Sequence, residues 1–106
     1  METPNFSYID DLAGGDMEFR DKLLSLLKKE LPGEIDIYVK TISEKDFKRS
    51  AEAVHKIKHK ITILGLEKTY SLAAKYEEEL KDGNAGFHKE FFEILKNMTI
   101  FLEKIK

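Results

Sequence analysis

The stretch from Ala51 to Leu66, AEAVHKIKHKITILGL, constrains the fold of this chain more than any other. Its apolar residues follow the three-and-four spacing of one helical face: Val54, Ile57, Ile61 and Leu64. Gly65 follows this stripe and can take the left-handed conformation that ends many helices. We therefore predict one amphipathic helix over residues 46–64, with Asp46 as its N-cap.

Two histidines lie beside this apolar stripe. At about 100° per residue, His55 falls next to Val54 at the solvent edge, and His59 follows one turn later on the same flank. Lysines alternate with them along the chain: Lys56, Lys58 and Lys60. The pattern predicts a rigid helix that presents an imidazole to solvent in a basic setting. Spacing alone assigns no chemistry to it, since most exposed histidines are ordinary surface residues.

The rest of the chain shows the same helical periodicity. It predicts a short helix or turn before Gly14–Gly15 and longer helices over 17–31, 34–43, 67–81 and 87–104. Asp16 is a suitable N-cap for the first long helix, and Pro32–Gly33 is expected to break or kink the chain after it. No segment alternates as a strand does.

Short connections between these helices predict antiparallel neighbours. We therefore expect an all-α chain, folded as an antiparallel up-down four-helix bundle with additional short N-terminal helices. One domain would span residues 1–106, in which residues 1–33 cover the bundle and residues 34–106 form it around the helix at 46–64. A chain of 106 residues buries roughly two-thirds of its unfolded surface, which is enough for a core.

Composition excludes several classes of protein. There is no cysteine, which rules out thiol nucleophiles and cysteine-ligated metal centres. No apolar run approaches the roughly 20 residues of a membrane span. The first residues lack the features of a secretory signal, so we expect a cytoplasmic protein without membrane contact. No glycine-rich phosphate loop indicates a nucleotide site.

Charge is unevenly distributed along the chain. The formal net charge of −2 argues against nucleic-acid binding. Residues 45–68, however, carry seven Lys or Arg against three acids, a local charge of +4. This basic region coincides with the histidine helix, where it suits an anion or an acidic partner surface. Lysines that merely solubilise an amphipathic helix would give the same pattern.

The run His55-Lys56-Ile57-Lys58, followed by Ile61 and by Leu64-Gly65-Leu66, resembles the signature of histidine-containing phosphotransfer (HPt) domains. In that family a phosphorylatable histidine is followed three residues later by lysine and ten residues later by glycine. The preceding Asp46-Phe47 and the stretch from Gly14 to Pro32 are similar to the family's pattern before that histidine. The resemblance spans nearly the whole chain.

The resemblance implies a phosphorelay carrier in two-component signal transduction. His55 would accept a phosphoryl group from one receiver-domain aspartate and pass it to another, with Lys58 stabilising the phosphoryl group and Lys56 adding to the basic field. The implied partners are response-regulator receivers and a hybrid sensor kinase, and the implied carrier is a monomer. The resemblance implies no cofactor, no metal of its own and no ATP-dependent kinase activity.

One position departs from the family pattern. Members commonly place glycine four residues after the phosphorylated histidine, and here that position is His59. A small residue leaves room above the imidazole for a partner's active site. His59 is therefore expected either to obstruct docking or to hydrogen-bond a phosphoryl oxygen.

Two other interpretations stay open. The bundle pattern and the charge distribution also fit an HPt-like interaction module that no longer transfers phosphate. His55 and His59, with Glu52 three residues before His55, could instead share a metal ion in a metal-binding helical bundle. Carboxylate bundles use Glu-x-x-His units in pairs on different helices, and this chain has a single such unit, so the expected site is weak and open.

Overall fold

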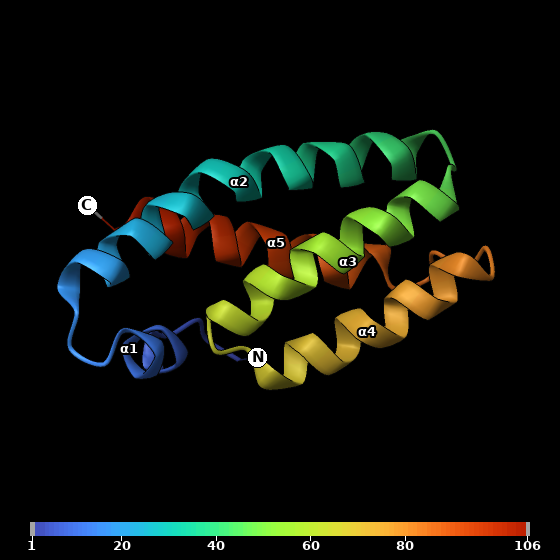
Figure 1. Ribbon diagram of the computed structural model, residues 1–106. Helices are drawn as coiled ribbons and strands as arrows, with labels where there is room; N and C mark the ends of the chain where they lie inside the picture. Colours follow the sequence, from blue (N-terminus) through green and yellow to red (C-terminus); the bar gives the residue numbers. More distant parts are fainter. Residues whose placement is uncertain (1, 106) are drawn as a thin grey trace.

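The computed structural model describes residues 2–105 of the chain, so Met1 and Lys106 of the predicted domain lie outside it. All five elements in this range are helices (Figure 1): α1 (Ser7–Ala13), α2 (Met17–Ser43), α3 (Phe47–Ile63), α4 (Glu67–Lys81) and α5 (His88–Glu103). The all-α prediction is confirmed for these residues, in which no strand is present. Each of these helices is too short or too polar to cross a lipid bilayer.

Helix α3 makes more contacts with other helices than any other described helix does. It packs along α2 on one side and along α4 on the other, while α5 packs against α2 (Figure 1). Helix α1 contacts α2 and α3. The arrangement is compatible with a helical bundle, and it places the two candidate histidines on a helix that has support from both flanks.

The predicted break at Pro32–Gly33 is wrong. Helix α2 runs without interruption from Met17 to Ser43, so the predicted boundary between covering helices and bundle falls inside one helix. A proline in a helix interior costs about 3 kcal/mol, because it removes an N–H donor and crowds the preceding turn. Here the proline is exposed, and buried residues lie on both sides of it, from Leu27 and Leu31 to Tyr38. Packing of both halves against the core therefore outweighs the local signal.

The ends of α3 are fixed by the local signals that predicted them. The side chain of Asp46 caps its first turn by accepting a backbone hydrogen bond. At the other end Gly65 has a φ of 74°, and the backbone N–H of Leu66 donates to the carbonyl oxygen of Ile61 at 3.2 Å, as in a Schellman cap. A Cβ atom at Gly65 would also lie 2.5 Å from Oδ1 of Asn5. The left-handed backbone conformation therefore favours glycine there, and any Cβ atom would also displace the Asn5 side chain.

The apolar stripe of α3 forms the centre of the core. All four of its predicted residues, Val54, Ile57, Ile61 and Leu64, are fully buried. On the flanking helices the helical spacing also predicts that Val39 and Leu72 face inward, but these side chains are 38% and 46% exposed. A charged residue on α4, Glu77, is buried instead.

Candidate functional site

His55 lies on α3 with one side open to solvent. Its side chain is 55% exposed, although the preceding residue, Val54, is completely buried. This is the position at the solvent edge of the stripe that the helical spacing predicts. The ring is therefore held by a rigid helix and is still accessible to a partner.

The side of His55 that faces α4 meets a buried carboxylate. Its Nδ1 atom lies 3.2 Å from Oε2 and 3.4 Å from Oε1 of Glu77. The Glu77 side chain is only 9% exposed. Because an ionised carboxylate can only accept hydrogen bonds, the neutral ring carries its proton on Nδ1 and donates it to Glu77. The lone pair of His55 is then on Nε2.

Two lysines complete the surroundings of Glu77. The Nζ atom of Lys58 lies 2.8 Å from Oε1, and that of Lys81 lies 3.6 Å from Oε2. Burial on its own raises the pKa of the Glu77 carboxyl, but the hydrogen bond and charge of Lys58, together with His55, bring that pKa below its ordinary value. Glu77 is therefore ionised at neutral pH while it orients the imidazole.

Lys58 is joined to His55 through a shared partner, the carboxylate of Glu77. Its side chain is 13% exposed, its ammonium is bonded to Glu77, and it lies 5.5 Å from the centre of the Tyr70 ring. The sequence predicts that Lys58 pairs with a phosphoryl oxygen, and that role stays a prediction. The contact that the structure gives it is with the carboxylate beneath the imidazole. An ammonium has three N–H donors, so this pairing leaves others available.

Lys60 lies on the opposite flank of α3 and takes no part in the site. Its Nζ atom lies 3.0 Å from Glu30 and 3.1 Å from Glu34, both on α2. Burial alone lowers the pKa of Lys60, but these two glutamates raise it above its ordinary value. Because its charge is compensated locally, the positive field around His55 is smaller than the sequence count suggests.

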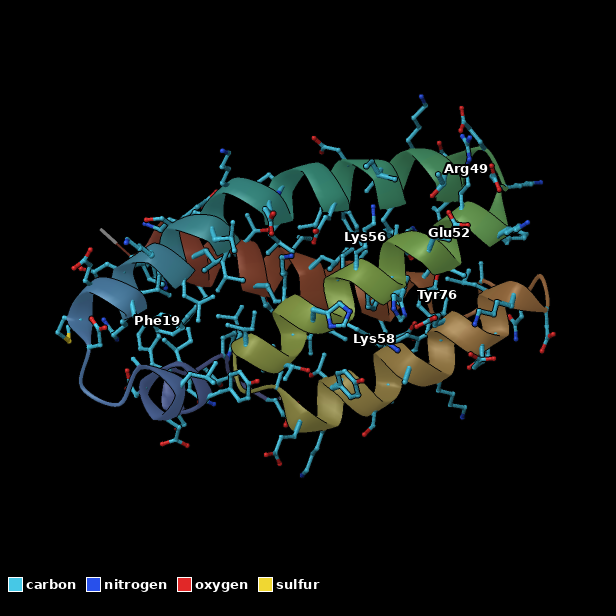
Figure 2. All side chains as sticks on the ribbon, in the orientation of Figure 1. Phe19, Arg49, Glu52, Lys56, Lys58 and Tyr76 are labelled. Carbon is cyan, nitrogen blue, oxygen red and sulfur yellow. The ribbon has the colours of Figure 1, made fainter. Side chains whose placement is uncertain are left out.

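A shallow surface hollow opens beside His55, between α3 and α4. It is lined by Lys48, Ala51, Glu52, His55, Lys56, Glu77 and Lys81. In Figure 2, Lys56 and Glu52 lie on the side of α3 toward α2, and Lys58 lies on the side toward α4. The exposed lysines at positions 48, 56 and 81 give the hollow a basic rim. The predicted site residue Lys56 is therefore close enough to contribute to the field at the imidazole.

His59 stands directly beside His55. The two ring centroids are 5.3 Å apart, with their planes at 89°, and both side chains are exposed. The residue that departs from the HPt pattern thus lies against one edge of the candidate phosphoacceptor. Among residues 2–105, no three histidine, aspartate or glutamate side chains are grouped together, so Glu52 does not complete a three-ligand set with this pair.

The third histidine belongs to a separate hydrogen-bonded chain. Nδ1 of His88 lies 2.8 Å from the hydroxyl oxygen of Tyr38, which lies 2.7 Å from the hydroxyl oxygen of Tyr76. Both tyrosines are fully buried. The chain joins α5, α2 and α4 through polar atoms within the core. It gives His88 a structural role, apart from the surface at His55.

Glu77 is the site residue that sequence reasoning missed. In the sequence it begins a run of three glutamates, which is typical of an exposed helix face. The available signal was its position: it follows the buried Tyr76 and stands four residues after the buried Ala73. A carboxylate at a buried position is rarely tolerated without a partner. A buried position for Glu77 therefore predicts a cationic partner on a neighbouring helix.

The site therefore combines a solvent-exposed imidazole, a buried carboxylate that contacts its Nδ1 atom, and a basic rim. Imidazole is a nitrogen nucleophile that is largely neutral near pH 7. Comparisons with known proteins found no matching family model, no matching curated protein and no matching solved structure.

Proposed function

We propose that this protein is a histidine phosphotransfer carrier of a two-component phosphorelay, phosphorylated on His55. The supporting observation is the contrast between the two ring nitrogens. Nδ1 lies 3.2 Å from the buried carboxylate of Glu77, whereas the exposed side of the ring carries the free lone pair. The nucleophile is thereby held in one tautomer and one orientation before a partner arrives.

The proposal includes the finer architecture that such carriers have. Helices α2 to α5 would form an antiparallel up-down four-helix bundle, with α1 covering one end. The connections at residues 44–46 and 64–66 are short, which favours antiparallel neighbours. In Figure 1 the colour gradient follows the chain along successive long helices in alternating directions, which supports this arrangement.

The chemical step needs little from the protein beyond positioning and charge. Nε2 of His55 attacks the phosphorus of a receiver's aspartyl phosphate; the N–P bond forms as the acyl O–P bond breaks, and the receiver's carboxylate leaves with the electron pair. No proton has to move, because Nδ1 keeps its hydrogen. The ring becomes positively charged, and Glu77 at 3.2 Å stabilises that charge. The reverse step phosphorylates a second receiver.

The lysines around the hollow support an acidic partner. Receiver domains gather carboxylates around their phosphorylated aspartate, and the basic rim of Lys48, Lys56 and Lys81 complements such a surface. Lys58 would supply a remaining N–H to a phosphoryl oxygen. The partners would be response-regulator receivers and a hybrid sensor kinase, met in the cytoplasm by a monomeric carrier without ATP-dependent kinase activity.

A transfer assay tests the proposal. The protein is incubated with several phosphorylated receivers, and label on it is tested for the acid lability and base stability of phosphohistidine. We expect label on the wild type and on His88→Gln, which removes the histidine outside the site and whose folding is verified by circular dichroism, but none on His55→Gln. Label that persists in His55→Gln, or no label from any receiver, would contradict the proposal. The second outcome would favour an HPt-like interaction module.

A further inference from the structure

We propose that His55 and His59 together bind one divalent transition-metal ion of the Cu²⁺ or Zn²⁺ class, and that the bound ion blocks Nε2 of His55. The binding is independent of the proposed function. The consequence for phosphotransfer rests on that function, because the blocked atom is the proposed phosphoacceptor.

The first observation is the placement of the two rings. They stand one helical turn apart on α3, with centroids separated by 5.3 Å. Both side chains are exposed, so the His59 side chain is free to rotate and bring a ring nitrogen toward its neighbour. Neutral imidazole is the side chain that Zn²⁺ and Cu²⁺ most commonly bind. The backbone that holds both ligands is a regular helix, which limits the entropy lost on binding.

The second observation is independent of that spacing. Histidines that bind metals almost always donate their other ring N–H to a carboxylate or carbonyl group, which orients the ring and raises its basicity. His55 has this arrangement already, with Nδ1 at 3.2 Å from Oε2 of Glu77. The carboxylate is itself held by Lys58 at 2.8 Å. The nitrogen left for a metal is therefore fixed in the required tautomer.

The expected site is open and of moderate affinity. Among the described residues, no third histidine, aspartate or glutamate joins the pair, so water would fill the remaining coordination positions. Lys48 and Lys56 on the rim oppose a dication and lower the affinity further. For two imidazole ligands Cu²⁺ should bind more tightly than Zn²⁺. Such an ion binds reversibly.

A titration tests the binding without any phosphorylation. Cu²⁺ and Zn²⁺ are added to the wild type, His55→Gln, His59→Gln and His88→Gln, and the heat of binding is measured by calorimetry. We expect one ion per chain in the wild type and in His88→Gln, and affinity at least about tenfold lower in the other two variants. No binding to the wild type, or unchanged affinity in His59→Gln, would overturn the proposal. Because His59 is exposed, this variant should fold, which circular dichroism verifies.

A second measurement tests whether the ion blocks the nucleophile. Diethyl pyrocarbonate acylates imidazole nitrogens, and mass spectrometry of peptides reports the modification of His55 alone. We expect Zn²⁺ to slow this modification in the wild type but not in His59→Gln. Equal protection in both proteins would show that the pair does not act together. Neither measurement involves a receiver, so failure of the transfer assay would refute the proposed function and leave this inference standing.

Discussion

The ammonium group of Lys58 lies 2.8 Å from the buried carboxylate of Glu77, which in turn contacts Nδ1 of His55 at 3.2 Å. The lysine comes from the same helix as the histidine, and the glutamate comes from the next helix. Two residues of α3 are thus joined through one residue of α4. The exposed imidazole depends on this interhelical contact for its orientation. The contact in turn requires the positive charge of Lys58 to compensate the buried negative charge of Glu77.

Glu77→Gln should weaken both stability and transfer. The substitution preserves size but leaves the largely buried Lys58 without its anionic partner. Breaking a fully buried ion pair costs roughly 3–5 kcal/mol, and we expect about 2–3 kcal/mol here because the lysine can turn toward water. Transfer should slow by roughly tenfold or more, the effect of losing a carboxylate that orients an imidazole. Urea unfolding and the labelling rate measure the two effects.

The control for this variant is Glu78→Gln, which alters an exposed carboxylate on the same helix. It should change stability by about 0.5 kcal/mol or less and leave the transfer rate unchanged. Equal losses in the two variants would mean that helix charge, rather than the contact with His55, is responsible.

The lowered pKa of Glu77 also predicts a pH dependence. In the folded protein, burial opposes ionisation, but the hydrogen bond and charge of Lys58 hold the pKa of the Glu77 carboxyl below its ordinary value of 4.5. Its contribution to stability is therefore complete above about pH 4.5 and is lost as the pH falls through the lower, folded value. The free energy of unfolding should fall on acidification in that range, and it should fall less steeply in Glu77→Gln. Parallel curves for the wild type and the variant would contradict this assignment.

His59→Gly tests the departure from the HPt pattern. The ring of His59 stands 5.3 Å from that of His55, and the HPt pattern predicts that a small residue at this position would leave room for a partner. We expect glycine to speed transfer by up to about tenfold, equivalent to about 1.4 kcal/mol of barrier, at a cost of about 1 kcal/mol in helix stability. A shorter phosphohistidine lifetime would show instead that His59 steadies the phosphoryl group. If rate and lifetime both stay unchanged, neither role is correct.

Local signals predicted α3 well, and tertiary contacts account for the failures. Asp46 and Gly65 fix the ends of α3 through neighbours in sequence, so their effect could be read along the chain. The sequence predicts a break or a kink at Pro32–Gly33. The break is wrong because both sides of the proline pack against other helices, and signals within the segment do not reveal that packing. Glu77 was overlooked because its partners stand about 20 positions away in the sequence, a relation that helical periodicity within one segment does not reveal.

Lys45→Gly should stabilise the protein. Lys45 has a φ of 58°, a left-handed conformation that is unfavourable for residues with a Cβ atom, in the turn after α2. The turn is closed by the N–H of Asp46, which donates to the carbonyl oxygen of Thr41 at 2.9 Å. Glycine removes about 1 kcal/mol of this strain, partly offset by its greater freedom in the unfolded chain. We expect a melting temperature higher by a few degrees. Lys45→Ala keeps the Cβ atom, so an equal gain in that variant would contradict the explanation.

Tyr38→Phe should cost more stability than Tyr76→Phe, although both residues are fully buried. The hydroxyl of Tyr38 lies between that of Tyr76 at 2.7 Å and Nδ1 of His88 at 2.8 Å. Removal of the Tyr38 hydroxyl leaves two polar groups without this partner and should cost about 2–3 kcal/mol of stability. Removal of the Tyr76 hydroxyl should cost about 1 kcal/mol, because Tyr38 can still donate to His88. Urea unfolding of the two variants and of the double variant measures the difference. The double variant should lose less than the sum of the two single losses, because the contact between the hydroxyls is counted in each of them. Strict additivity would mean that the hydroxyls contribute independently, which their 2.7 Å separation argues against.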